Sequence, residues 1–175
     1  RKVSLKMMLE HTKSVRMGVK KSLLVIDLPY NTYRNKSEAL KNSKKAIKET
    51  KCDAVKIEGG SRVKDIVLHL VKNKIPVLGH IGITPQTTKG KFKSKGKTET
   101  EKKKLINDAK VLEQSGAFGI VLECIYSDIS KKITNLIKIP TIGIGASKQC
   151  DGQILVTDDM IGLSNIRPRF VKEYS

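Results

Sequence analysis

The sequence predicts an α/β protein, a (β/α)8 TIM barrel that here lacks its first two βα units. Short β-branched runs alternate with helical patterns, which indicates βαβ units and a parallel sheet. Six such runs occur, whereas a closed barrel has eight strands and about 250 residues. Most of the runs end in polar residues, as the strands of barrel enzymes do. We expect one barrel domain over residues 1–175, incomplete at its N-terminus; an open doubly wound sheet is the rival architecture.

Five segments have the apolar spacing of amphipathic helices. The first begins at Leu5 and ends near Gly18. Ser37 is expected to cap a second helix that continues to Thr50, with Leu40 and Ile47 facing inward. The other three are predicted from apolar residues three and four positions apart: Val63, Ile66, Val67, Leu70 and Val71; Leu105, Ala109 and Leu112; and Ile129, Ile133, Leu136 and Ile137.

The predicted strands are short runs rich in Val and Ile, and helical patterns separate most of them. In chain order they are Ser22–Asp27, Asp53–Glu58, Pro76–His80, Ala117–Glu123, Pro140–Ile144 and Gln153–Val156. No apolar run approaches the roughly 20 residues that a membrane span needs, so a membrane protein is excluded.

The charge is strongly positive, with 35 Lys and Arg against 17 Asp and Glu and a formal net charge of +18. Only six of the basic residues are Arg, and aromatic residues make up 4% of the chain. Guanine contacts favour Arg, and binding of single strands uses aromatic stacking, so the composition disfavours nucleic acid as a partner. We interpret the excess as a solvated Lys-rich surface; a non-catalytic basic binding protein is the alternative. The three cysteines form no C-x-x-C pair, which favours reduced thiols in an intracellular compartment.

Distinctive polar residues stand on or at the end of four predicted strands. Asp27 ends the first, Lys56 and Glu58 lie in the second, His80 ends the third, and Glu123 ends the fourth. Because the carboxyl ends of barrel strands meet at one face, these side chains are expected to form the active site. Taken singly, each has a structural reading as a turn residue, a buried ion pair, a core histidine or a helix cap.

The residue types suit enolate chemistry. Two carboxylates without a thiolate cluster are typical ligands of a hard cation such as Mg²⁺. In this interpretation the metal polarises a carbonyl, Lys56 offsets negative charge, and Glu123 moves a proton.

Several ordered motifs resemble the ketopantoate hydroxymethyltransferase family. They are Val55-Lys56-Ile57-Glu58-Gly59-Gly60, Gly79-His80-Ile81-Gly82-Ile83-Thr84-Pro85-Gln86, Val121-Leu122-Glu123-Cys124, Pro140-Thr141-Ile142-Gly143-Ile144-Gly145-Ala146 and Cys150-Asp151-Gly152-Gln153-Ile154-Leu155-Val156. The resemblance covers essentially the whole chain. It implies transfer of a hydroxymethyl group from methylenetetrahydrofolate to α-ketoisovalerate, through an enolate chelated by Mg²⁺, on the route to pantothenate and coenzyme A.

The resemblance also implies roles for individual residues. Asp27 and Glu58 match metal ligands, Asp27, Lys56 and His80 match substrate-binding positions, and Glu123 matches the catalytic base. It further implies a decameric homo-oligomer in the cytoplasm, or in mitochondria if the source is eukaryotic. A further metal-binding Asp of the family belongs to a Val-Gly-Asp-Ser motif that lies upstream of Arg1.

Other departures from the family pattern are Ser147, Ile125-Tyr126 and Asp158-Asp159, and a lysine-rich loop over 89–97 replaces a glycine-rich lid. Two enzyme-related alternatives stay open. One is another Mg²⁺-dependent barrel enzyme, a lyase or mutase that acts on the carbon–carbon bonds of 2-oxo acids. The other is an inactive remnant of the barrel.

Overall fold

The computed structural model describes residues 3–88, 93–164 and 168–174. Its strands form one sheet in which each strand pairs in parallel with the next along the chain. They are β1 (Val25–Asp27), β2 (Ala54–Glu58), β3 (Val77–Gly82), β4 (Gly119–Glu123), β5 (Thr141–Ile144) and β6 (Gly152–Gln153). This confirms the predicted parallel α/β class. The unbroken strand order differs from that of a doubly wound sheet, in which the order reverses at a switch point.

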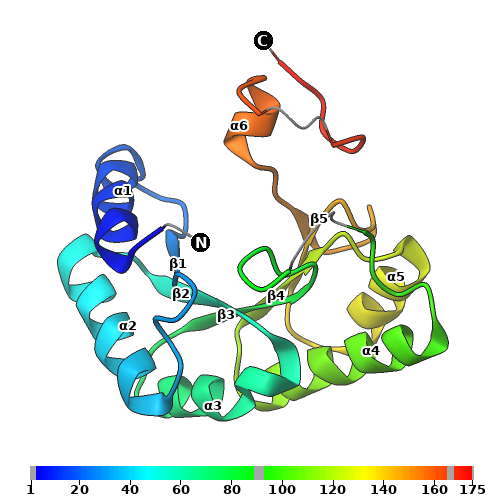
Figure 1. Cartoon of the computed structure of the whole chain (residues 1–175), viewed down its shortest axis with the longest axis horizontal. Helices are drawn as coiled ribbons and strands as arrows, with labels where there is room; N and C mark the ends of the chain where they lie inside the picture. The colour runs from blue at the N-terminus through cyan, green and yellow to red at the C-terminus, as the bar shows by residue number, and fades with distance from the viewer. Residues whose placement is uncertain (1–2, 89–92, 165–167, 175) are drawn as a thin grey trace.

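The helices lie mostly on one side of this sheet. They are α1 (Leu5–Gly18), α2 (Lys36–Thr50), α3 (Lys64–Lys72), α4 (Glu99–Gln114), α5 (Ser127–Leu136) and α6 (Thr157–Met160), with a 3₁₀ turn η1 (Gly60–Val63) before α3. Helices α2 to α5 each follow one strand and run along the outer side of the sheet, while α1 packs beside α2 and α6 stands apart on the C-terminal arm (Figure 1). Within the described residues no helix combines the length and apolar character of a membrane span.

Alternation along the strands divides the sheet into a helix-facing core and a polar inner face. Val55 and Ile57 of β2 and Ile120 and Leu122 of β4 are fully buried in the core. Period-two alternation turns the residues between them to the opposite face. The polar residues of β2 and β4 therefore share the inner side of the sheet.

Helix α2 begins two residues earlier than predicted. Asn35, not Ser37, is the N-cap: its side chain accepts a hydrogen bond from the Glu38 N–H at 2.9 Å. The Glu38 carboxylate reaches back to the Arg34 N–H at 2.9 Å, as in a capping box displaced by one residue. The prediction of Ser37 as the cap was wrong, because Asn caps as well as Ser and its backbone is extended there. Leu40 and Ile47 are half-buried and pack against the core, as expected.

Three other predicted features differ in the structure. Leu136 is 42% exposed, because α5 ends there and Ile137 beyond it turns inward. The first strand is shorter than predicted and begins only at Val25. The sixth ends at Gln153, and Ile154, Leu155 and Val156 are exposed. Part of the predicted 89–97 loop lies outside the described residues; from residue 93 onward it leads to Lys95, which bridges to Ile125 after β4.

Candidate active site

The sheet register brings the predicted site residues together. Asp27 of β1 pairs with Lys56 of β2, and Glu58 of β2 pairs with His80 of β3. Glu123 at the end of β4 pairs with Gly82, two residues beyond His80 on the same strand. Because alternate residues share a face, all five side chains point to the inner side at the carboxyl ends of the strands. The predicted clustering is therefore confirmed.

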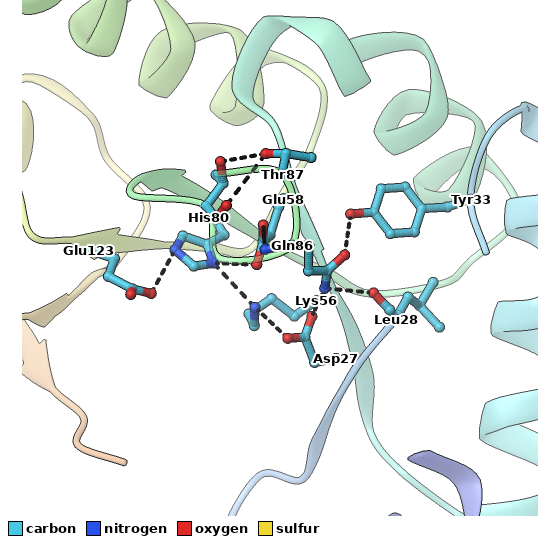
Figure 2. A network of polar contacts seen from close by, with 10 residues as sticks. Asp27, Leu28, Tyr33, Lys56, Glu58, His80, Gln86, Thr87 and Glu123 are labelled. Atoms are coloured by element: carbon cyan, nitrogen blue, oxygen red, sulfur yellow. Dashed lines mark hydrogen bonds and ion pairs between the residues drawn. The ribbon is translucent and has the colours of Figure 1, made fainter. Parts of the chain in front are cut away.

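The side chains form a continuous polar chain (Figure 2). Lys56 Nζ lies 2.9 Å from Asp27 Oδ2 and 3.2 Å from His80 Nδ1. On the other side of the imidazole, His80 Nε2 lies 3.1 Å from Glu123 Oε2. The ring N–H is not aligned with that carboxylate oxygen, so the contact has the distance of an ion pair without the direction of a hydrogen bond. Lys56 and His80 thus connect two carboxylates at opposite ends of the chain.

The neighbours of His80 assign its tautomer. An ammonium group can only donate, so Nδ1 must accept from Lys56 and the proton of the neutral ring resides on Nε2, facing Glu123. His80 is 2% exposed, and burial lowers its pKa while the contact with Glu123 opposes that shift. The Nε2–H of the neutral imidazole therefore lies beside the Glu123 carboxylate, 3.1 Å from its Oε2.

Glu58 is the most deeply buried carboxylate of the site. It is 5% exposed, and burial raises its pKa to about 7; Lys56 opposes this shift and the negative charge of Asp27 adds to it. Its Oε1 lies 3.8 Å from His80 Nδ1, and its Oε2 accepts a hydrogen bond from the Gln86 N–H at 3.1 Å. The protein leaves part of this buried negative charge uncompensated, which favours a bound cation.

The residues present fit a hard divalent cation. Asp27 and Glu58 offer carboxylate oxygens close enough for the charge of one to raise the pKa of the other. In the described part of the chain no three His, Cys, Asp or Glu side chains are grouped to hold a metal by themselves. Mg²⁺ commonly binds through one or two carboxylates and completes its shell with water and substrate oxygens. Asp27 and Glu58 are therefore the candidate ligands.

Gln86 joins this network although the sequence did not single it out as a site residue. It lies in the turn after β3, where Pro85 occupies the second position and the Thr87 N–H donates to the Thr84 carbonyl at 3.0 Å. Its amide contacts Asp27, Leu28 and Tyr33. Its place in the Thr84-Pro85-Gln86 motif after the strand was the only signal that could have indicated it.

Two cavities flank the polar chain. One, of about 230 Å³, begins at His80 and Gly82 and extends to Arg62, Lys95 and Lys104. The other, of about 220 Å³, is more apolar and lies against Asp27 and Gln86. Glu101 and Asp108 also line the first cavity, and Asp108 pairs with Lys104, so its wall carries charges of both signs.

Several other basic and nucleophilic residues of the described chain make no contact with this polar chain. His11 is exposed on α1 and His69 is half-buried on α3. Cys52 and Cys150 are buried free thiols. All five Lys residues of α2 are exposed, in agreement with a solvated basic surface: Lys36, Lys41, Lys44, Lys45 and Lys48.

Among solved structures, a phosphonomutase-like protein from Burkholderia cenocepacia superposes with a TM-score of 0.60 at 10% sequence identity, covering 82% of this chain and 61% of that one. This similarity concerns the fold alone. The curated 3-methyl-2-oxobutanoate hydroxymethyltransferase of Pelagibacter ubique is 61% identical over 175 residues, which are 100% of this chain and 68% of the relative. The same-named protein of Sulfurimonas denitrificans is 46% identical over 98% of this chain and 66% of its own length.

The chain therefore spans about two thirds of the length of these relatives. The sequence model of one enzyme family, described as ketopantoate hydroxymethyltransferase, matches residues 1–175. With the two relatives, this match shows that the chain belongs to the ketopantoate hydroxymethyltransferase family.

Proposed function

We propose that the protein transfers a hydroxymethyl group from methylenetetrahydrofolate to α-ketoisovalerate (3-methyl-2-oxobutanoate) and so supplies ketopantoate for pantothenate and coenzyme A synthesis. The name of the curated relatives supports this keto acid as the substrate. The observation that carries the proposal is the inward-facing Glu123 carboxylate, 3.1 Å from the Nε2 of a neutral His80.

The first step removes the proton from C3, the carbon next to the ketone. Glu123 accepts this proton, and His80 orients the carboxylate from its Nε2 side. Lys56, held between Asp27 and His80, opposes the negative charge of the keto acid and of the enolate that forms. Mg²⁺, held by Asp27 and Glu58 when bound, supplies Lewis-acid polarisation of the ketone.

The second step forms a bond between C3 and the methylene carbon of the folate donor. Both carbon–nitrogen bonds of that methylene break, water supplies the hydroxyl oxygen, and tetrahydrofolate leaves with its two nitrogens protonated, one proton coming from water and the other replacing the proton removed from C3. We infer that the donor enters through the cavity beside His80 and Gly82, because folates carry carboxylates and Arg62 lies on the wall of this cavity. Arg62 makes no ion pair with any described residue, so its charge is available to a ligand.

We also propose that the six strands, which are adjacent in chain order, form part of a (β/α)8 barrel domain. The partners that belong to the same proposal are the keto acid, the folate donor and further copies of the chain in a cytoplasmic decamer.

Hydrogen–deuterium exchange at C3 of α-ketoisovalerate tests the base without the folate donor. With the native protein and Mg²⁺ in heavy water, we expect exchange that Glu123→Gln slows by about a hundredfold or more. Glu10→Gln, an equal charge change on the exposed side of α1, serves as the control and should exchange like the wild type. Equal rates for Glu123→Gln and the wild type would refute the assignment.

A further inference from the structure

We propose that Gln86 is a positioning residue that fixes the orientation of Asp27 and Glu58, the two candidate metal ligands. This inference rests on the proposed function and extends it to a residue outside the predicted site. Gln86 is half-buried at the turn after β3, and it reaches both carboxylates from one position (Figure 2).

Its side-chain amide is held by three hydrogen bonds. Nε2 donates to Asp27 Oδ1 at 3.2 Å and to the Leu28 carbonyl at 2.9 Å. Oε1 accepts from the Tyr33 hydroxyl at 2.9 Å. A flipped amide would place its oxygen against two acceptors, so the contacts allow one orientation only. The NH₂ group therefore faces Asp27.

Tyr33 stabilises this orientation of the Gln86 amide from the side opposite Asp27. Burial raises the pKa of its phenol well above the usual value, so the hydroxyl stays protonated and remains a donor to Gln86 Oε1. The phenol makes no hydrogen bond to the Asp27 carboxylate in the described structure, and it reaches that carboxylate only through the amide. Tyr33 and Gln86 are therefore expected to act on Asp27 as one unit.

The backbone of Gln86 serves the other ligand. Its N–H donates to Glu58 Oε2 at 3.1 Å, and the Thr84–Thr87 turn fixes its direction. The two contacts use different atoms, so a side-chain substitution removes the bond to Asp27 and keeps the bond to Glu58. This separation allows the positioning role to be tested at one ligand.

A neutral amide suits the role chemically. Lys56 already binds Asp27 Oδ2, and Gln86 donates to Oδ1, so each oxygen of this carboxylate has one donor that sets its direction. The amide adds no charge that would compete with a cation. Partners in the outer shell of a metal ligand commonly account for about tenfold to a hundredfold in metal affinity.

The test is Mg²⁺ titration of the native protein by calorimetry in the presence of α-ketoisovalerate. We expect Gln86→Met, which keeps the side-chain length but removes all three amide bonds, to raise the Mg²⁺ dissociation constant by about tenfold to a hundredfold. The KM for the keto acid should rise with it, while kcat at saturating Mg²⁺ should change little. Gln114→Met, at the exposed end of α4, is the matched control and should bind Mg²⁺ like the wild type.

Tyr33→Phe tests the same unit without altering the volume of the site, and so covers the case in which Gln86→Met fails to fold. We expect a smaller rise in the Mg²⁺ dissociation constant, and a double variant that binds Mg²⁺ no more weakly than Gln86→Met alone. The inference would be overturned if Tyr33→Phe and a folded Gln86→Met both bound Mg²⁺ like the wild type. If the wild type still exchanged C3 normally, the proposed function would stand. A wild type without C3 exchange would overturn the proposed function as well.

Discussion

His80 Nε2 lies 3.1 Å from Glu123 Oε2, and this contact couples the candidate base to a buried neutral imidazole. His80 comes from the strand next to that of Glu123, and Lys56 fixes the opposite ring nitrogen at 3.2 Å. The ring therefore has one position and one tautomer. The orientation of the base depends on it.

We expect His80→Gln to slow C3 exchange by about tenfold, less than the loss of the base itself, because the carboxylate remains but its neighbour no longer holds it in place. The measurement is the same exchange reaction, followed by NMR, with thermal unfolding as a check of folding. His69→Gln on α3 is the control. An unaltered exchange rate in a folded His80→Gln would show that the imidazole does not orient Glu123.

The sequence was sufficient to predict the strands that build the site, because period-two alternation and parallel pairing follow from local pattern. Lys56 and Glu58 share a face for that reason, and the register then places Asp27 beside Lys56. Gln86 was not predicted as a site residue, because its contact with Asp27 depends on how the turn after β3 folds back toward β1. That path is set by tertiary packing and has no periodic signal.

The errors at element ends have similar causes. Asn35 and Ser37 are both good caps, and the choice depends on which residue has extended backbone when the chain leaves the loop. Leu136 and Ile137 are both apolar, and only the end of α5 decides which one turns inward. Single-sequence patterns therefore predicted the interior of each element better than its ends.

Gly82 is expected to be essential for the shape of the site. It has a φ of 101°, and a Cβ there would lie 2.2 Å from the Glu123 carbonyl oxygen. Gly82→Ala should therefore lower the free energy of unfolding by about 2 kcal/mol or more, from backbone strain and the clash together. Gly18→Ala is the matched control, since nothing lies within 4 Å of its Cβ and it ends α1. Urea unfolding that ranks the two variants equally would contradict this prediction.

Asp151 should make stability depend on pH. The Thr141 N–H donates to Asp151 Oδ2 at 2.8 Å, and this bond is the main cause of a pKa below the usual value. A lowered pKa in the folded state adds stability above the unfolded pKa of about 3.9, and this stability is lost as the pH falls through the folded value.

Asp151→Asn keeps an acceptor but removes the charge. We expect it to cost about 0.5–1 kcal/mol of unfolding free energy at pH 6, a small value because the group is largely solvated, and less at pH 3. Urea unfolding at both pH values measures the difference. A cost that is the same at both would show that the charge of Asp151 does not contribute.

A substitution at Arg62 is expected to affect the step that uses the folate donor and to leave proton removal from the keto acid unchanged. Arg62 lies on the wall of the 230 Å³ cavity, and it makes no ion pair with any described residue. Arg62→Gln should raise the KM for methylenetetrahydrofolate by about fivefold, the effect of an exposed charge pair worth roughly 1 kcal/mol. C3 exchange of the keto acid requires no folate, so its rate should stay at the wild-type value.

A donor without the glutamate carboxylates makes this prediction sharper. If Arg62 binds those carboxylates, removing them should weaken binding to the wild type and leave Arg62→Gln almost unaffected, since the two changes delete the same interaction. Lys72→Gln, an equal charge change on the exposed side of α3, should behave like the wild type with both donors. Equal sensitivity of Arg62→Gln and the wild type to the loss of the carboxylates would place the donor elsewhere.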